Sequence, residues 1–312
     1  MADSAEFVSI VIVSLDGESV LPACLGSIDR VDWPRERLEV IVVNNGSADA
    51  TGRIAEEWRN RRVVPVHLPS NRGFAGGNNA GIAIARGDWV ILLNDDTEVE
   101  PDWLQTLMAE GRAHPRAGIL GSLLLYGDRR TVQHAGGIVQ PNALTGHIGA
   151  QEEDRGQFQE TRPCDYVTGA AFAISRTTLD AVGMLDAGYW PIYFEEVDYC
   201  WRTRTAGFEV LTTAARTIHH ESRTTVALSP GFLRKYHRNR LRFAAINFDT
   251  RGKLRWARHE WRWLRDNRRH LPWGILLGAY LRALPLAPWW CLNGMRRRKN
   301  PRIAPPVASP ME

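Results

Sequence analysis

Four short, nearly continuous apolar runs organise the N-terminal part of the chain. They are rich in β-branched residues, and each has the length of a single strand: Val8–Ser14, Leu38–Val43, Val63–Leu68 and Asp88–Leu93. Apolar runs without polar alternation are typical of parallel strands that are buried on both faces. The pattern therefore predicts strands inside a sheet that helices cover on both sides.

Stretches with helical character separate these runs, at Val20–Ile28, Ala50–Arg59 and Gly77–Arg86. Strands that alternate with helices in this way predict a doubly wound, mostly parallel α/β sheet. Ligands of such sheets bind beyond the carboxyl ends of the strands. We therefore expect three segments to converge on one crevice: Ser14–Gly17, Asn44–Asp49 and Asn94–Thr97.

The middle of the chain continues the same mixed pattern up to an abrupt change of composition near Pro230. Helices are expected at Asp102–Ala113 and at Glu195–Ala206, which ends before Gly207. Further apolar or strand-like segments lie at Gly118–Leu125, Tyr166–Ser175 and Phe208–Thr213. We expect this middle region to bind a second substrate.

Charge divides the chain near residue 231. Residues 232–312 carry 19 Lys and Arg residues against 4 Asp and Glu residues, whereas residues 1–231 carry 20 against 31. The C-terminal region also holds six of the twelve tryptophans. A basic region beside an acidic body indicates an anionic partner, either nucleic acid or a lipid headgroup surface.

The apolar stretch Leu271–Asn293 favours the lipid surface and argues against nucleic acid. It is nearly long enough to span a bilayer, but Arg282 and three prolines interrupt it, and basic residues flank it on both sides. Tryptophans and basic flanks of this kind predict an amphipathic helical anchor that lies in the membrane plane or re-enters it. A helical subdomain that packs on the rest of the protein is the alternative.

Several protein classes are disfavoured by what the sequence lacks. Cys24, Cys164, Cys200 and Cys291 show neither a CxxC pair nor zinc-finger spacing, so a reducing compartment is expected. The polar N-terminus resembles no export signal. No GxGxxG follows the first strand and no GxxxxGK[ST] occurs, which argues against a Rossmann dehydrogenase and a P-loop enzyme.

Two acidic clusters are the main chemical candidates. Asn94-Asp95-Asp96-Thr97 directly follows a predicted strand, where hard carboxylate oxygens suit a divalent cation that also binds phosphate. An Asp-rich turn that caps the helix near Pro101 is the structural alternative.

The second cluster, Glu195-Glu196-Val197-Asp198, follows the aromatic string Tyr189–Phe194. Partial burial there would raise the pKa of a carboxyl group toward that of a useful base. The alternative is an acidic first helical turn, with Asp198 and Arg202 as an ordinary i,i+4 ion pair. We prefer the structural role for Asp198 and the chemical role for Glu196.

Two weaker signals complete the candidates. The pair His219-His220 follows the last strand-like segment, where a neutral imidazole is suited to bind a metal or a diphosphate. Glycines precede a predicted helix between residues 71 and 79, where backbone can approach an anion closely. The candidate residues of this stretch are Asn71, Gly73, Gly76 and Asn78.

Taken in order, five segments resemble family 2 glycosyltransferases, notably the rhamnosyl- and galactofuranosyltransferase-like branch. They are VSIVIVSLDG, VIVVNNGSADAT, NRGFAGGNNAGIAIARGDWVILLNDDTEVEPDWL, VTGAAFAISR and YFEEVDYCWRTRTAGF, within residues 7–242. The resemblance implies a GT-A fold over residues 1–231, with a nucleotide-binding half (about 1–115) and an acceptor half (about 116–231). Residues 232–312 would form the basic, membrane-associating helical extension.

The resemblance also assigns roles to individual positions. Ser14, Leu15, Asp16 and Asn44 would face the nucleotide, with Asp49 in support, and Gly169 would line the donor diphosphate. Asp96 and His220 would hold Mg²⁺ or Mn²⁺, with Asn94 and Asp95 beside them. Glu196 would be the catalytic base and Glu195 would orient the acceptor or the neighbouring carboxylate.

Three residues depart from the family pattern, two at the positions that bind the nucleobase and one at the position of the catalytic base. Leu15 stands where an aromatic residue usually stacks on the base, Asn44 where an Asp usually reads it, and Glu196 where the catalytic base is usually Asp. A dTDP- or UDP-sugar donor is expected, because an amide can still pair with a pyrimidine edge.

The resemblance implies an inverting, metal-dependent hexosyltransferase of cell-surface polysaccharide assembly, with a saccharide or lipid-linked saccharide acceptor. It would work at the cytoplasmic face of the cell membrane. A sugar-phosphate nucleotidylyltransferase and a catalytically inactive GT-A binding protein are the alternatives.

Overall fold

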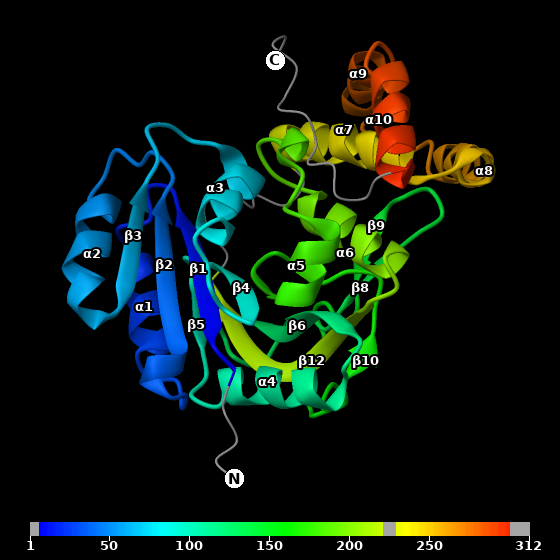
Figure 1. Cartoon of the computed structure of the whole chain (residues 1–312). Coiled ribbons are helices and arrows are strands. Elements are labelled where there is room, and N and C mark those ends of the chain that lie inside the picture. Colours follow the sequence, from blue (N-terminus) through cyan, green and yellow to red (C-terminus); the bar gives the residue numbers. More distant parts are fainter. Residues whose placement is uncertain (1–5, 221–228, 300–312) are drawn as a thin grey trace.

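The computed structural model describes residues 6–220 and 229–299. A curled sheet in the order β10-β12-β6-β11-β4-β1-β2-β3 forms its centre (Figure 1). The apolar runs of the N-terminal part form the parallel strands of one half: β1 (Val8–Ser14), β2 (Leu38–Asn44), β3 (Val63–His67) and β4 (Trp89–Asn94). The four predicted strands are confirmed.

The other half of the sheet is mixed. β11 (Ala171–Ser175) runs antiparallel between β4 and β6 (Ala117–Tyr126), and the long β12 (Glu209–His219) runs parallel to β6. Of the apolar segment at residues 166–175, only the last five residues are in a strand. The shorter strands are β5 (Thr97–Val99), β7 (Val132–His134), β8 (Gly137–Val139), β9 (Thr145–His147) and β10 (Arg162–Pro163).

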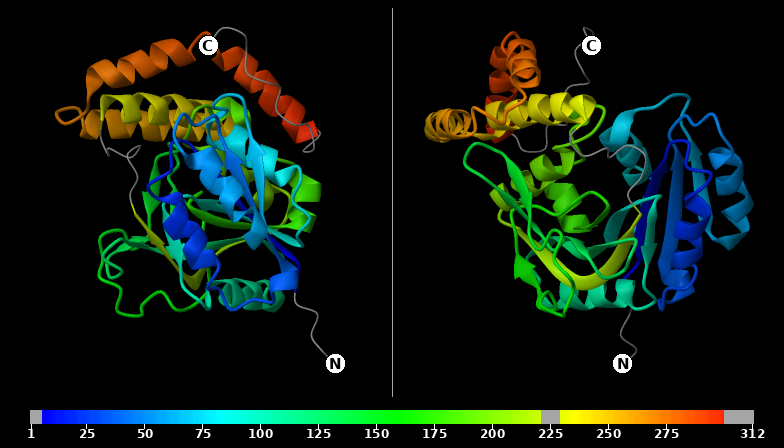
Figure 2. Two further views of the ribbon diagram at one scale, coloured as in Figure 1. Left: turned by 90° about the vertical axis from the view of Figure 1, so that its left-hand side faces the viewer. Right: turned by 180° about the vertical axis from the view of Figure 1, so that it is seen from behind.

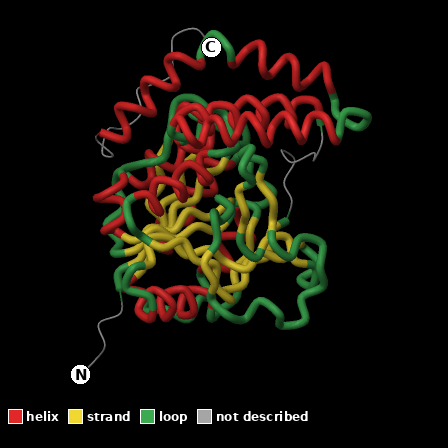
Figure 3. The backbone as a smooth tube through the Cα atoms, turned by 90° about the vertical axis from the view of Figure 1, so that its right-hand side faces the viewer, coloured by secondary structure: helices red, strands yellow, loops and turns green. Residues whose placement is uncertain are grey.

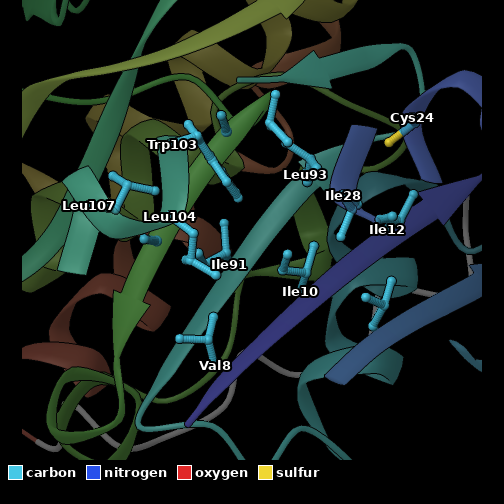
Figure 4. Packing of buried hydrophobic residues seen from close by; sticks show 14 of the residues in the cluster. Val8, Ile10, Ile12, Cys24, Ile28, Ile91, Leu93, Trp103, Leu104 and Leu107 are labelled. Atoms are coloured by element: carbon cyan, nitrogen blue, oxygen red, sulfur yellow. The ribbon is translucent and has the colours of Figure 1, made fainter. Parts of the chain in front are cut away.

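Helices cover both faces of the sheet, as the doubly wound prediction requires. Val8, Ile10 and Ile12 of β1 face one core, which α1 (Leu21–Ile28), α2 (Thr51–Glu57) and α4 (Trp103–Ala113) cover (Figure 4). Side chains of the opposite register, such as Val11, face a second core. That core lies under α3 (Gly73–Ile82), α5 (Arg176–Val182) and α6 (Glu195–Thr205). Three short 3₁₀ helices lie at Arg35–Arg37, Trp58–Arg61 and Ala187–Tyr189.

The glycine-rich helix α3 begins at Gly73, four residues before the predicted start at Gly77, and ends at Ile82. The backbone N–H of Phe74 donates to the carbonyl of Pro191 at 2.9 Å, a long-range contact that a sequence pattern does not show. Close packing explains a glycine further along the helix. A Cβ at Gly81 would lie 2.3 Å from Cγ1 of Val11, so α3 rests directly on β1.

Four helices gather along one side of the molecule: α7 (Pro230–Asn247), α8 (Thr250–Asp266), α9 (Trp273–Ala283) and α10 (Ala287–Lys299) (Figures 1, 2 and 3). Among the described residues, no single helix has both the length and the apolar character to cross a membrane. Trp273–Ala283 and Ala287–Arg297 meet those criteria only as a pair, bent by 64°. Residues 300–312 of the predicted extension lie outside the described residues.

Almost all of α7 follows the predicted boundary at residue 231, but it packs on the body of the protein that precedes the boundary. Arg240 of α7 is fully buried and forms two hydrogen bonds of 2.7 and 2.6 Å to Glu260 of α8. Asn142, from the loop between β8 and β9, donates to the same carboxylate at 3.1 Å and accepts from Trp256 at 3.0 Å. This buried cluster joins α8 to α7 and to the loop between β8 and β9.

Glu260→Ala should destabilise the fold by about 3–5 kcal/mol, because it leaves the Arg240 guanidinium buried without its carboxylate. Urea unfolding followed by circular dichroism measures the change. Glu56→Ala is the matched control, since its partners Arg59 and His67 are exposed, and it should change the stability little. Equal losses in the two variants would contradict this account of the buried pair.

Candidate active site

A pocket of about 340 Å³ opens where the carboxyl end of β4 meets α6 and α7. Four of the predicted site residues line it: Asn94, Gly169, Glu195 and Glu196. Aromatic side chains form much of the remaining wall, namely Phe74, Tyr126, Tyr166, Tyr193, Phe194, Phe232 and Tyr236. The sheet domain and the first C-terminal helix thus share one cavity.

The two glutamates at the start of α6, Glu195 buried and Glu196 half-buried, form no ion pair with a cationic side chain among the described residues. Glu195 is 2% exposed, and its Oε2 forms no hydrogen bond within the described structure. Burial raises the pKa of Glu195 well above its usual value, and the negative charge of Glu196 adds to the rise. Burial also raises the pKa of Glu196, to about 7. A carboxyl group with that pKa can exchange a proton near neutral pH.

A strained turn presents these carboxylates. Tyr193 and Phe194 have left-handed backbones, with φ of 83° and 78°, which costs about 1–3 kcal/mol for each non-glycine residue. The side chain of Asn239, fully buried on α7, directs its Nδ2 at the carbonyl oxygens of Tyr189, Ile192 and Tyr193, at 2.9, 3.0 and 3.0 Å. Asn239 therefore holds the turn, a role that no sequence motif indicates.

The structural role preferred for Asp198 is confirmed. Its carboxylate accepts from Nε of Arg202 at 2.8 Å, from Asn247 at 2.8 Å and from Arg297 at 3.1 Å. Burial opposes ionisation, but Arg297 and Arg202 outweigh it and lower the pKa of Asp198 to about 2. Asp198 is thus a permanently charged anchor for α6 and α10.

In the acidic pair after β4, Asp96 is buried and Asp95 is half-buried. Ser14 donates to Oδ2 of Asp95 at 2.5 Å, and burial together with the charge of Asp96 raises the pKa of Asp95 to about 6. Asp96 is 4% exposed, and its Oδ1 has no hydrogen-bond partner in the described structure. A buried, unpartnered carboxylate oxygen fits a divalent cation.

The imidazole that faces Asp96 belongs to His219 and not to the predicted His220. Nε2 of His219 lies 3.3 Å from Oδ1 of Asp96, whereas Nε2 of His220 lies 2.7 Å from Oε1 of Glu98. His219 is the last residue of β12 and pairs with Thr97 of β5, next to Asp96, whereas His220 lies beyond the end of the strand and only His219 lines the pocket. The structure therefore places His219, and not His220, beside the Asp96 side chain, while the metal-binding role of either histidine stays a prediction.

Gln133, on β7, was missed by the sequence analysis and orients His219. Its Oε1 lies 2.6 Å from Nδ1 of His219 and can only accept, so this contact requires a proton on Nδ1 and directs Nε2 toward Asp96. Among the described residues, no group of three or more His, Cys, Asp or Glu side chains could hold a metal ion. A cation held by Asp96 and His219 would take its other ligands from substrate oxygens and water.

The loops after β1 and β2 converge as predicted, but their polar side chains accept hydrogen bonds from backbone N–H groups of the same two loops. Oδ1 of Asp16 accepts from the backbone of Ala48 at 2.8 Å, and Oδ1 of Asn44 accepts from the backbone of Ser47 at 2.9 Å. Asp49 similarly accepts from the backbone of Glu18 at 3.0 Å. Their role toward a nucleotide stays a prediction.

Ser14 and Leu15, at the end of β1, differ in how accessible their side chains are to a ligand. Ser14 is fully buried and directed at Asp95. Leu15 is 43% exposed, so its side chain is open to a planar base.

The glycine-rich stretch packs inside the protein. Oδ1 of Asn71 accepts from the backbone of Gly73 at 2.7 Å, and the buried Asn78 donates to the carbonyl of Phe74 at 3.0 Å. A Cβ at Gly73 would lie 2.7 Å from the carbonyl oxygen of Pro191, and one at Gly169 would lie 2.6 Å from Cζ of Phe74. These glycines allow α3 to approach the turn that presents the glutamates.

Gly76 lies on α3, where a Cβ would meet the side chain of Arg72. Asn45, which the sequence analysis missed, holds the start of the same helix. It accepts from the backbone of Arg72 at 2.9 Å and donates to the carbonyl of Gly73 at 3.3 Å.

Comparison with known proteins reveals related sequences over most of the chain. An uncharacterized protein of Sinorhizobium fredii is 36% identical over 233 residues, covering 70% of this chain and 25% of that protein. An N-acetylglucosaminyl-diphospho-decaprenol L-rhamnosyltransferase of Mycobacterium tuberculosis is 26% identical over 249 residues, covering 70% of this chain and 79% of that enzyme. The chain thus spans a quarter of the first relative and most of the second.

The fold is shared with solved GT-A glycosyltransferases. The structure of GalNAc-T7 with UDP, GalNAc and Mn²⁺ aligns with a TM-score of 0.64 at 18% identity, covering 80% of this chain and 49% of that chain. The model of glycosyl transferase family 2 matches residues 9–183, from β1 to the end of α5. Because that match spans more than half of the sequence and the fold agrees, the chain belongs to glycosyl transferase family 2.

Proposed function

We propose that the chain is a metal-dependent, inverting hexosyltransferase that moves a rhamnose- or galactofuranose-like sugar from a dTDP- or UDP-sugar to a saccharide or lipid-linked saccharide. The observation that carries the proposal is the adjacent pair Glu195 and Glu196, which lines an aromatic pocket together with Asn94 at the end of β4. The decaprenol-linked acceptor in the name of the mycobacterial relative supports a lipid-linked acceptor and a role in cell-surface polysaccharide assembly.

The catalytic step needs a base on one side of the sugar and a leaving group on the other. Glu196 would accept the proton of the acceptor hydroxyl as that oxygen attacks the anomeric carbon, so one displacement inverts the configuration. Glu195, more deeply buried, would orient the acceptor or its neighbouring carboxylate. Mg²⁺ or Mn²⁺ held by Asp96 and His219 would neutralise the departing diphosphate.

Aromatic rings form the proposed acceptor side of the pocket. The rings of Tyr193 and Phe232 lie 4.8 Å apart, and those of Phe232 and Tyr236 lie 5.8 Å apart and stacked. Ligand pockets of this kind combine apolar walls with a few convergent polar groups. The flat rings suit the apolar face of a sugar, and the glutamates supply the polar groups.

The proposed place of work is the cytoplasmic face of the cell membrane, with the C-terminal region on the lipid surface. Exposed apolar residues of α9 support this, since Trp273, Leu277 and Leu281 are 49%, 59% and 58% exposed. Monomeric soluble proteins rarely expose large contiguous apolar patches.

Two alternatives have less support. A nucleotidylyltransferase would usually need a basic loop after β1, and Ser14–Gly17 contains no Lys or Arg. A catalytically inactive binding protein is favoured only by Leu15 and Asn44, which depart from the family pattern. Metal-dependent hydrolysis of a panel of nucleotide sugars would separate turnover from binding.

Glu196→Gln should lower sugar transfer by roughly 10²–10⁴-fold, because it keeps the size of the side chain but removes the basic carboxylate. Steady-state transfer measures the rate, and calorimetry with the donor should show nearly unchanged binding. Glu195→Gln is the neighbouring control and should be milder. Transfer by Glu196→Gln at near the parent rate would remove Glu196 as the base.

The raised pKa of Glu196 predicts a pH limit on the acid side. Because the base must be ionised, kcat/KM should fall about tenfold per pH unit below pH 7 and level off above it. The pH profile of transfer checks this, and the residual activity of Glu196→Gln should lose that limb. A parent rate that stays flat from pH 5 to pH 8 would contradict the assignment.

Asp96→Ala and His219→Ala should each weaken Mn²⁺ binding in the presence of UDP by at least about tenfold, since each would remove one of two protein ligands. Paramagnetic resonance of free Mn²⁺ measures binding without turnover. His220→Ala is the matched control and should bind Mn²⁺ nearly as the parent does. If His220→Ala weakens Mn²⁺ binding and His219→Ala does not, His220 and not His219 is the metal ligand.

A further inference from the structure

One side of α8 combines arginines with large apolar side chains. The exposed residues recur at spacings of three and four, which places them on the same side of a helix: Arg251, Leu254, Arg255, Arg258, Trp261, Arg262 and Arg265. Leu254 is 70% exposed and Trp261 is 69% exposed. These seven residues are called the α8 face below.

The buried side of α8 fixes the direction of this face. Glu260 is held by Arg240 and Asn142, and Trp256 donates to the carbonyl of Asn142 at 3.0 Å. The guanidinium of Arg240 also lies 5.3 Å from the ring centre of Trp263. Rotation of α8 about its axis would break these contacts, so the protein presents the α8 face in a defined orientation at the edge of the helical layer (Figures 1 and 2).

The charges of the α8 face are largely uncompensated. Within the described part of the chain, none of Arg251, Arg255, Arg258 and Arg262 forms an ion pair, and only Arg265 has an acidic partner, Asp266. So dense a positive face attracts phosphate groups, which both lipids and nucleic acids carry. Leu254 and Trp261 decide between them, because leucine and tryptophan gain free energy in the interfacial layer of a bilayer and have little to contact on a phosphate backbone.

We propose that the α8 face binds anionic lipid headgroups, with the arginines on the phosphates and with Leu254 and Trp261 inserted at the level of the acyl boundary. This docking surface rests on the proposed function, because the proposed function places the protein at a membrane. It assigns the contact to α8, whereas the sequence pattern places the anchor in the apolar stretch Leu271–Asn293. Because α7 carries both α8 and the aromatic residues Phe232 and Tyr236, docking would hold the acceptor side of the pocket near the membrane.

Binding of the full chain to vesicles tests the proposal. Phosphatidylglycerol vesicles should bind the protein and pure phosphatidylcholine vesicles should bind it much less, with affinity falling as salt screens the charges. Arg258→Glu/Arg262→Glu should weaken binding by about 30-fold or more, since each arginine near an anionic surface contributes about fivefold. The matched control is Arg37→Glu/Arg62→Glu, two exposed arginines elsewhere with the same change of charge, and it should bind nearly as the parent does.

Leu254→Ser/Trp261→Ser completes the design and should also weaken vesicle binding. Weakening by the arginine variant but not by the serine variant, together with tight binding of duplex RNA, would overturn the lipid assignment in favour of nucleic acid. Equal weakening by Arg258→Glu/Arg262→Glu and the control would overturn it as well. Donor hydrolysis should be unchanged in all these variants. A parent that binds vesicles but lacks hydrolysis and transfer would refute the proposed function and leave the docking surface standing.

Discussion

The carboxyl groups of Glu195 and Glu196 at the start of α6 line one pocket, and within the described residues no ion pair with a cationic side chain compensates them. Water would favour their ionised forms, so the fold has to hold them where ionisation is costly. The left-handed backbone of Tyr193 and Phe194 aims them into the pocket, and Asn239 fixes that turn from α7. The close approach of α3 at Gly73 supports the same turn from the other side. Much of the local architecture follows from placing this pair.

Other buried acids near this pair have an arginine as partner. Asp198, two residues after Glu196, has Arg202 and Arg297 as partners, and the pKa of its carboxyl group falls to about 2. Glu260 has Arg240, and Asp186 has Arg242. Asp198, Glu260 and Asp186 are as buried as Glu195, so the presence or absence of a guanidinium decides which of these acids anchors the structure and which can exchange a proton.

The C-terminal helices have two roles that the charge pattern does not separate. α7 belongs to the pocket, since Phe232 and Tyr236 line it and Asn239 supports its acidic turn. α8 faces outward with its arginines and is tied to α7 through the Arg240–Glu260 pair. A single buried ion pair thus links the wall of the pocket to the basic surface of the protein.

The sequence by itself determined the doubly wound sheet, the four N-terminal strands and the two acidic segments, because apolar periodicity and strand-end polar residues are local signals. It also indicated the structural role of Asp198, whose partner Arg202 lies one helical turn away. Only the tertiary structure decided that His219 faces Asp96, because the pairing of β12 with β5 brings His219 opposite Thr97, far away along the chain. Asn239 and Gln133 were likewise invisible in the sequence, because each acts on a segment distant along the chain, and such contacts arise only when the helices and strands pack.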